Sequence, residues 1–355
     1  MKIYSLILAG GSGTRFWPLS RECAPKQLLN LSGHDVMINE TISRNKDIIP
    51  EANTYIITNE CQGDILKKLL IKGVDTGNIL IEPVGRNTSA CIGFSALVIN
   101  HRHGDSVVCI FPSDAYIGKI LEYSRVLKMA CDYAETHDAI LTLGIKPSYP
   151  ATGYGYIKYD ASSADRGIFH VEEFVEKPGI EKARSLIEDG RYLWNSGIIV
   201  ARTGTLLKNF ERFLPKLYKH LKKFEEHIDT ENESSEMEKL YSSLQSMSVD
   251  YGILERSDDV MVIPSDFDWN DVGSWDTLGV IYPPDKEGNI VRAEHIGIDT
   301  RNSIIYGNKL ITTIGVDGLV IVNTDDALLI CSKARSQEVK NIVEILKTQG
   351  KLEYV

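Results

Sequence analysis

The sequence predicts an α/β protein: a doubly wound, mainly parallel sheet with helices on both faces, followed by a small β domain. Two observations predict this fold class. Over residues 1–145, nearly continuous apolar runs alternate with helical patterns, as in a parallel sheet that is covered on both faces. Over about residues 288–336, short β-branched runs are separated by turn residues, which is typical of a small β domain.

Length and composition agree with this organisation. The chain has 355 residues, of which 43% are hydrophobic and 25% charged, so it can bury a sizeable core. We expect a large domain at residues 1–285, made of a first half at about 1–145 and a mixed lobe at about 146–285. A smaller β domain with a C-terminal helix is expected at residues 286–355.

The sequence pattern of the first half predicts alternating strands and helices. The predicted strands lie at residues 3–8, 54–58, 79–82, 107–111 and 140–145. The predicted helices lie at residues 37–46, 62–71, 89–101 and 121–136. Because the carboxyl ends of parallel strands share one edge of a sheet, we expect the segments after residues 9, 82 and 111 to converge on one site.

The rest of the chain has a more mixed pattern. Strands are expected at residues 153–159, 169–175 and 196–201, and helices at residues 180–189 and 337–347. Between residue 206 and about residue 244, the pattern predicts charged helices that are joined by a solvated turn at residues 229–236.

Charge and hydropathy exclude two classes of partner. The net charge of −10 argues against a general nucleic-acid binder, which would carry a basic surface. A small anionic substrate is not excluded, since Arg15, Arg21 and Lys26 form a local basic cluster. No apolar stretch is long enough to span a membrane and no targeting segment is visible, so we expect a cytoplasmic protein.

The cysteines give no sign of a metal site. Six are scattered along the chain, without a Cys-x-x-Cys pair or a Cys/His spacing typical of zinc. We expect them to be reduced thiols. Cys23 lies close to charged residues, but no base that would activate it is near in the sequence, so we expect no chemical role for it.

The segment after the first predicted strand is the most informative part of the sequence. Residues 10–29 read GGSGTRFWPLSRECAPKQLL. A strand that stops at paired glycines brings backbone N–H groups to a phosphate chain, which Arg15 and Lys26 can neutralise. The Walker pattern is absent, and Phe16 replaces the third glycine of the dinucleotide fingerprint. The loop therefore predicts chemistry at the phosphates of a nucleotide.

This string resembles the signature of sugar-nucleotide pyrophosphorylases, and its FWPLSR and PKQLL portions resemble the mannose-1-phosphate guanylyltransferase branch. The resemblance covers about residues 3–280 and, more weakly, the C-terminal β part, where it implies a short left-handed β-helix. It implies that GTP and mannose 1-phosphate react, with Mg²⁺, to GDP-mannose and pyrophosphate. The apolar β C-terminal part is a plausible dimer surface, so we expect a homodimer. Bifunctional relatives carry a further β-barrel domain for which this sequence has no room, so we expect a single activity.

The resemblance assigns nucleotide binding to the first half of the chain. There, residues 82–90 (EPVGRNTSA) lie against the base and ribose, and Glu82 would accept hydrogen bonds from guanine N1–H and its 2-amino group. Thr88 is a candidate N-cap of the following helix. The expected nucleotide-binding residues are Leu8, Ala9, Gly10, Gly11, Gly13, Thr14, Arg15, Lys26, Glu82, Pro83, Arg86, Asn87, Thr88, Pro112, Ser113 and Asp114.

Two carboxylates are the candidate ligands of Mg²⁺. Asp114 follows an apolar strand in FPSDA, and Asp271 lies in FDWNDVGSW, which resembles the W-x-D-V-G-x-W element of the family. Mg²⁺ prefers one or two carboxylates together with phosphate oxygens and waters. Many relatives have His after the first aspartate, where this chain has Ala115, so we expect a lost supporting contact rather than a lost metal.

The resemblance assigns the sugar phosphate to the mixed lobe, on the motifs TGYGYI, FVEKP and WNSGI. Glycines there allow close approach of the backbone, Glu176 could accept from sugar hydroxyls, and Lys177 offers a compact positive charge for the 1-phosphate. The expected sugar-phosphate-binding residues are Gly153, Tyr154, Gly155, Glu176, Lys177, Asn195 and Asp271.

The expected reaction needs positioning and charge neutralisation more than a covalent nucleophile. Two alternatives stay open at this point: a nucleotidyltransferase that joins glucose 1-phosphate to UTP or dTTP, and a regulatory protein that binds a sugar nucleotide without turnover. The expected catalytic residues are Arg15, Lys26, Asp114, Lys177 and Asp271.

Overall fold

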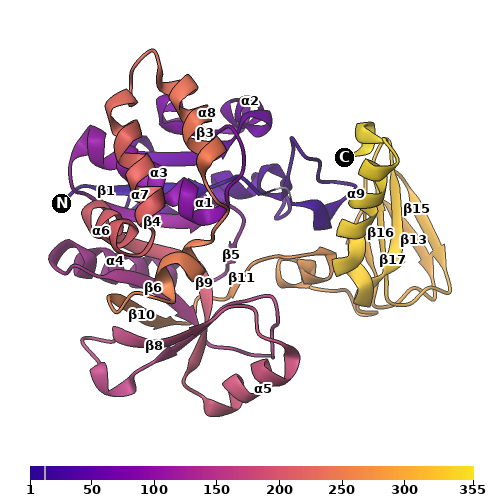
Figure 1. The fold of residues 1–355 in the computed structure, drawn as a ribbon. Helices are drawn as coiled ribbons and strands as arrows, with labels where there is room; N and C mark the ends of the chain where they lie inside the picture. Colours follow the sequence, from indigo (N-terminus) through magenta and orange to yellow (C-terminus); the bar gives the residue numbers. More distant parts are fainter. Residues whose placement is uncertain (12) are drawn as a thin grey trace.

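One large sheet forms the centre of the first domain (Figure 1). The computed structural model describes residues 1–11 and 13–355, and within them nine strands pair in the order β3-β2-β1-β4-β9-β6-β10-β8-β7. The strands are β1 (Ile3–Leu8), β2 (Thr54–Asn59), β3 (Ile79–Glu82), β4 (Val107–Pro112), β6 (Ile140–Ile145), β7 (Tyr156–Tyr159), β8 (Phe169–Val175), β9 (Tyr192–Arg202) and β10 (Val260–Ser265).

The direction of the strands confirms the mainly parallel sheet predicted from the sequence. Strands β3, β2, β1 and β4 pair in parallel, as do β6 and β10. Only β9 and β8, among the described strands of this sheet, run against the rest: β9 is antiparallel to β4 and β6, and β8 to β10 and β7. Strand β9 therefore joins the mixed lobe to the first half through the middle of the sheet.

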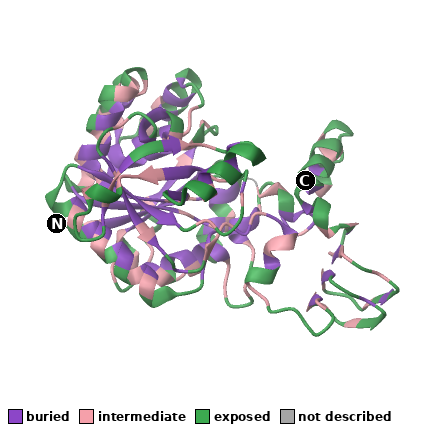
Figure 2. Ribbon diagram, turned by 90° about the horizontal axis from the view of Figure 1, so that it is seen from below, coloured by how far each residue is buried: buried purple, intermediate pink, exposed green. Residues whose placement is uncertain are grey.

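Helices cover both faces of the sheet. Leu6 belongs to the core on one face and its neighbour Ile7 to the core on the other, as the alternation of a strand requires. Figure 2 shows the resulting buried centre in purple. The helices of this domain are α1 (Met37–Asn45), α2 (Glu60–Leu69), α3 (Asn87–His103), α4 (Ile120–Thr136), α5 (Ile180–Asp189), α6 (Thr203–Phe213), α7 (Pro215–Phe224) and α8 (Glu233–Ser243).

The C-terminal domain is built of coils of parallel strands, in two sheets. In one sheet β12, β14 and β16 pair in parallel and β17 adds antiparallel to β16; in the other, β13 pairs in parallel with β15. This alternation between two sheets is that of a β-helix. The strands are β12 (Ile290–Arg292), β13 (His295–Ile298), β14 (Ile304–Gly307), β15 (Ile311–Ile314), β16 (Leu319–Asn323) and β17 (Leu328–Ser332).

A hydrophobic cluster joins the two domains. Phe16 comes from the glycine-rich loop, Trp275 from the segment after β10, Ile304 from the β-helix, and Val343 from the C-terminal helix α9 (Val339–Thr348). The indole N–H of Trp275 donates to the Trp17 carbonyl at 3.1 Å. The loop after β1 is therefore packed between the sheet domain and the β-helix.

None of the helices in the described part of the chain combines the length and the hydrophobicity that crossing a lipid bilayer would require.

Candidate active site

Two very short strands bring the predicted metal ligands to the same place. Strand β5 (Tyr116–Ile117) begins just after Asp114, and β11 (Trp269–Asn270) ends just before Asp271. The two strands pair antiparallel with each other. Segments that are far apart in the sequence thus place their carboxylates beside one cavity.

Two adjoining cavities open at the carboxyl ends of β1, β3 and β4. The first has a volume of about 410 Å³, and its lining includes the predicted residues Leu8, Gly10, Gly11, Glu82, Asn87, Thr88, Pro112, Ser113 and Asp114. The second has a volume of about 360 Å³, and its lining includes the predicted residues Gly13, Thr14, Arg15, Lys26, Asp114 and Asp271. Asp114 lines both cavities, so the two adjoin at this residue.

Buried amides hold the glycine-rich loop from inside. Gln27 Nε2 donates to the carbonyls of Ala9 and Gly11 at 2.9 and 3.0 Å, and Gln62 Nε2 donates to the Gly11 carbonyl at 3.2 Å. Gly13 has a φ of 56°, and a Cβ there would lie 2.4 Å from the Lys26 backbone nitrogen, so only glycine fits. Sequence reasoning missed both glutamines, although Gln27 lies within the PKQLL motif.

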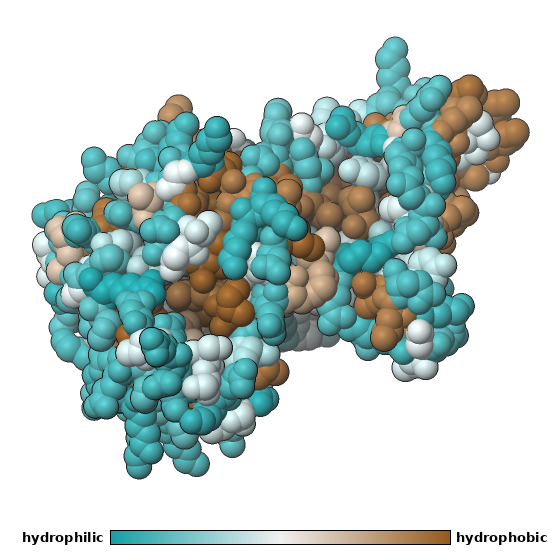
Figure 3. All heavy atoms as spheres, turned by 90° about the horizontal axis from the view of Figure 1, so that it is seen from above, coloured by the Kyte–Doolittle hydropathy of each residue, from teal (hydrophilic) through white to brown (hydrophobic). Residues whose placement is uncertain are grey.

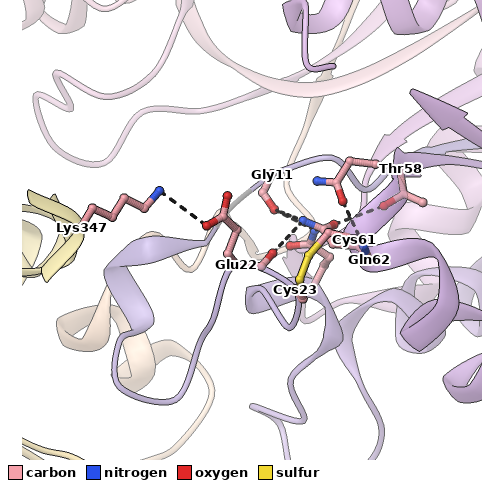
Figure 4. The surroundings of a disulfide bond; sticks show 9 residues. Gly11, Glu22, Cys23, Thr58, Cys61, Gln62 and Lys347 are labelled. Carbon is pink, nitrogen blue, oxygen red and sulfur yellow. Dashed lines mark hydrogen bonds and ion pairs between the residues drawn. A yellow bond between two sulfur atoms is a disulfide. The ribbon is translucent and has the colours of Figure 1, made fainter. Parts of the chain in front are cut away.

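The same loop carries a disulfide, contrary to the prediction of reduced thiols. Cys23 is bonded to Cys61 at the start of α2, with 5.2 Å between their Cα atoms (Figure 4). The prediction was wrong for this pair because the cysteines are 38 residues apart and meet only through the fold. The bond ties the loop to α2 next to Gln62, which also donates to the Glu22 carbonyl at 3.3 Å. The cysteines at positions 91, 109, 131 and 331 are free thiols.

The two predicted loop cations differ in their surroundings. Lys26 is 4% exposed; its ammonium lies 2.9 Å from the Asp114 carboxylate and also donates to the Asp271 carbonyl. Arg15 is exposed at the second cavity, and within the described residues no ion pair or hydrogen bond of its side chain is found. Lys26 therefore positions the two aspartate segments, whereas Arg15 is available to a ligand.

Asp271 also has its carboxylate fixed. Tyr154 Oη donates to Asp271 Oδ1 at 2.7 Å, and burial together with this carboxylate raises the pKa of the tyrosine. The rings of Trp194 and Trp269 each lie 5.2 Å from the Tyr154 ring. The next residue, Val272, has a φ of 44°, a strained conformation for a β-branched side chain, and its N–H donates to the Asn270 side chain.

The two carboxylates fit the needs of Mg²⁺. Each makes its ion pair or hydrogen bond through one oxygen, Asp114 Oδ2 and Asp271 Oδ1. Among the described residues no group of three or more His, Cys, Asp or Glu side chains is placed to hold a metal. A site with two carboxylates suits a cation that takes its other ligands from water and substrate phosphates. At the position after Asp114, where many relatives have His, Ala115 is buried, and its carbonyl oxygen accepts a hydrogen bond from Arg44 at 3.0 Å.

The predicted sugar residues other than Asp271 lie on β9 and in the loops next to β7 and β8. Asn195 accepts from Thr142 Oγ1 at 3.0 Å and donates to Asp250 Oδ1 at 3.1 Å. Glu176 forms an ion pair with Lys177, whose φ is 45°, and a Cβ on Gly155 would meet the Glu176 carboxylate at 2.5 Å. Gly153 has open space around it, so no steric constraint requires glycine there.

Asp250 was missed by sequence reasoning. It begins a short π-helix (Asp250–Leu254), and its side chain lines the first cavity. Burial raises the pKa of Asp250 to about 6, and the Glu176 carboxylate adds to the rise. Its link to Asn195 connects the first cavity to the sugar-side residues.

Four predicted nucleotide residues are placed differently from the rest. Ala9, which is buried, lines neither cavity, and neither do Pro83 and Arg86. Arg86 Nε donates to the Tyr241 carbonyl of α8 at 3.0 Å. Thr88 as an N-cap was wrong: the residue before the first helical residue of α3 is Arg86, and the Thr88 hydroxyl accepts from the Val249 N–H at 2.8 Å. The side chains of Arg86 and Thr88 thus bond to distant parts of the chain, although Thr88 also lines the first cavity.

Glu82 places a buried carboxylate at the first cavity. It is 7% exposed, and within the described residues its Oε1 has no hydrogen-bond partner. Its Oε2 would lie 3.5 Å from a Cβ on Gly10, so the carboxylate is close to the start of the glycine-rich loop. Burial raises the pKa of Glu82 to about 7, and the Tyr241 hydroxyl offsets part of the rise. A ligand with hydrogen-bond donors would satisfy this carboxylate.

The pattern of the nucleotidyl transferase family matches residues 4–283, which is more than half of the chain. The chain belongs to the nucleotidyl transferase family. A second pattern, described as the MannoseP isomerase/GMP-like beta-helix domain, matches residues 293–346, in agreement with the coils of the C-terminal domain. The handedness of these coils stays a prediction.

Named relatives extend over nearly the whole chain. The xanthan biosynthesis protein XanB of Xanthomonas campestris pv. campestris (strain B100) is 37% identical over 99% of this chain and 74% of its own. A mannose-1-phosphate guanylyltransferase of Escherichia coli (strain K12) is 36% identical over 99% of this chain and 75% of its own. A crystal structure titled mannose-1-phosphate geranyltransferase, from Thermus thermophilus, has a TM-score of 0.88 and 30% identity, covering 98% of this chain and 100% of that one.

Proposed function

We propose that this nucleotidyltransferase transfers GMP from GTP to mannose 1-phosphate, forming GDP-mannose and pyrophosphate. The observation that carries the proposal is that two cavities of different chemistry adjoin at Asp114. One holds a buried, unsatisfied carboxylate suited to a base, and the other holds two aspartates and an exposed arginine suited to phosphates. Relatives and the Thermus structure named for mannose 1-phosphate support the choice of sugar.

The reaction is an in-line displacement at the α-phosphorus. An oxygen of the sugar phosphate forms a bond to that phosphorus while the bond to the bridging oxygen of pyrophosphate breaks. The attacking oxygen is already anionic at neutral pH, so no general base is needed. The chain supplies orientation and positive charge: Arg15 and the loop line the second cavity, and Lys26 fixes Asp114. Lys177, which is ion-paired with Glu176 and lines neither cavity, is the proposed holder of the sugar phosphate.

Mg²⁺ is the proposed cofactor, held by Asp114 and Asp271. Bound there, the ion would offset the negative charge of the phosphate oxygens. Lys26 and Tyr154 fix the orientation of the two carboxylates before substrate arrives, through the ion pair and the hydrogen bond described above.

Glu82 is the residue that we propose to recognise guanine. A carboxylate accepts two hydrogen bonds side by side, which matches the N1–H and 2-amino donors of guanine and not the Watson–Crick edge of adenine. The buried position of Glu82 makes an unsuitable base costly, because it would leave the carboxylate without donors.

The protein is further proposed to act as a homodimer through the β-helix. Its outer surface exposes large apolar side chains, seen as brown atoms at the right-hand end of the molecule in Figure 3. Ile298 and Ile314, which are 57% and 74% exposed, lie opposite each other on β13 and β15. The exposed set is Ile296, Ile298, Leu310, Ile314, Leu328 and Ile330.

The substrates are tested by pyrophosphate release in the presence of Mg²⁺. GTP, UTP, dTTP and ATP are each paired with mannose 1-phosphate and glucose 1-phosphate. We expect release only from GTP with mannose 1-phosphate. Release from another pair would replace the substrates and keep the mechanism. Binding of a sugar nucleotide without release from any pair would favour a regulatory protein.

Asp271→Asn removes one proposed metal ligand. We expect a folded protein whose Mg²⁺-dependent turnover falls by roughly a hundredfold or more, because several kcal/mol of charge stabilisation is lost. Asp268→Asn is the matched control: it lies in the same segment, contacts Lys119 at 3.1 Å and should retain turnover. Undiminished activity of Asp271→Asn would refute the metal assignment.

Glu82→Gln should raise the KM for GTP by about tenfold or more, since a hydrogen-bonded charge is lost. In the wild type, the KM for GTP should also rise as the pH falls below about 7, because the acceptor carboxylate becomes protonated. Cys91 and Tyr241, the titratable groups that face Glu82, have raised pKa values and stay neutral there. The glutamine variant should lose the change near pH 7 and keep only the dependence of Asp250, which lines the same cavity and has a pKa of about 6; an equal pH dependence in both would exclude this role.

The dimer is tested by mass in solution. Light scattering should give about twice the chain mass of 39.7 kDa, and Ile298→Glu with Ile314→Glu should reduce it to one chain mass. Leu121→Glu, at an 89% exposed residue of α4, should leave the dimer intact. A wild-type monomer would contradict the proposal.

A further inference from the structure

A lysine of the C-terminal helix reaches the phosphate end of the active site. Lys340, in the first turn of α9, lines the second cavity together with Gly13, Arg15 and the two aspartates, Asp114 and Asp271. All other residues of this lining come from the first domain or from the segment that follows β10. Nothing in the sequence pattern near Lys340 indicated such a position.

The start of α9 is held firmly where Lys340 projects. Just before the helix, Ser336 Oγ donates to Asp276 Oδ1 and Gln337 Nε2 donates to Ser274 Oγ, each at 2.5 Å. Both partners lie within five residues of Asp271 in the chain. The helix is thus fixed to the same segment that carries a proposed metal ligand.

Apolar packing secures the helix from its other side. Val339 and Val343 are each 2% exposed and belong to the same buried cluster as Phe16 of the loop and Trp275. Burying these two apolar side chains away from water favours one fixed position of α9 on the loop. The position of Lys340 is therefore set by packing and not by the reach of a loose side chain.

The second cavity has little positive charge to offer a phosphate without Lys340. Lys26 is neutralised by Asp114, and Asp271 adds a second negative charge to the lining. Among the described residues, neither Arg15 nor Lys340 takes part in an ion pair or hydrogen bond through its side chain, and both are exposed. A compact ammonium on a flexible stem is well suited to phosphate oxygens.

We infer that Lys340 binds the phosphate chain of the nucleotide and the departing pyrophosphate, so that the β-helix domain contributes a binding residue directly to the active site. This inference rests on the proposed nucleotidyl transfer. The C-terminal domain then takes part in the reaction as well as in folding. Lys340 and Arg15 together supply positive charge to the phosphates, which Lys26 does not supply because it is already paired with Asp114.

The inference is tested by direct binding of inorganic pyrophosphate with Mg²⁺, followed by calorimetry, in wild type and variants. Lys340→Ala should raise the Kd by about tenfold, and the difference should shrink at high salt, because a charged hydrogen bond is lost. Lys340→Arg should retain most of the affinity. Lys347→Ala, the matched change at the second lysine of α9, should bind like the wild type.

The outcomes separate this inference from the proposed function. Equal Kd values for wild type and Lys340→Ala, with active wild type, would overturn the role of Lys340 alone. Absence of pyrophosphate release from any substrate pair would overturn the proposed function. If Lys340→Ala is unfolded, Lys340→Gln, which keeps most of the side-chain stem and removes the charge, takes its place in the same measurement.

Discussion

The geometry of the site depends on the buried ammonium of Lys26. It joins three parts of the chain: the glycine-rich loop, the end of β4 through Asp114, and the segment after β11 through the Asp271 carbonyl. A buried charge without a partner is costly, so each of these parts restricts the position of the other two. The cation thus works mainly as a fixed centre around which the two cavities meet.

Much of the fold could be predicted from the sequence because apolar runs indicate buried strands. Strands β1, β3, β6 and β8 have the predicted bounds. Strand β10 was not predicted, and Pro264 within its short run explains why a strand was not expected there. Side-chain contacts between distant segments could not be predicted from the sequence either. The bond of Cys23 to Cys61 and the contact of Thr88 with Val249 form only once the chain has folded.

Several site residues carry features that stability alone would not favour. Asn87, Lys177 and Val272 have φ values of 65°, 45° and 44°, and all lie in or beside predicted binding segments. The sequence motifs located these segments, but no sequence rule predicts a left-handed valine or lysine. The unsatisfied oxygen of Glu82 belongs with them, because a buried acceptor without a donor lowers stability until a ligand supplies one.

The aromatic surroundings of Tyr154 give the molecule a built-in optical signal. Trp194 and Trp269 flank the tyrosine whose hydroxyl is bonded to Asp271, while Trp17 and Trp275 lie where the loop meets the C-terminal domain. The chain has four tryptophans, so each of them lies in one of these two places. Intrinsic fluorescence, without any attached dye, therefore follows both the aspartate end of the site and the junction between the domains.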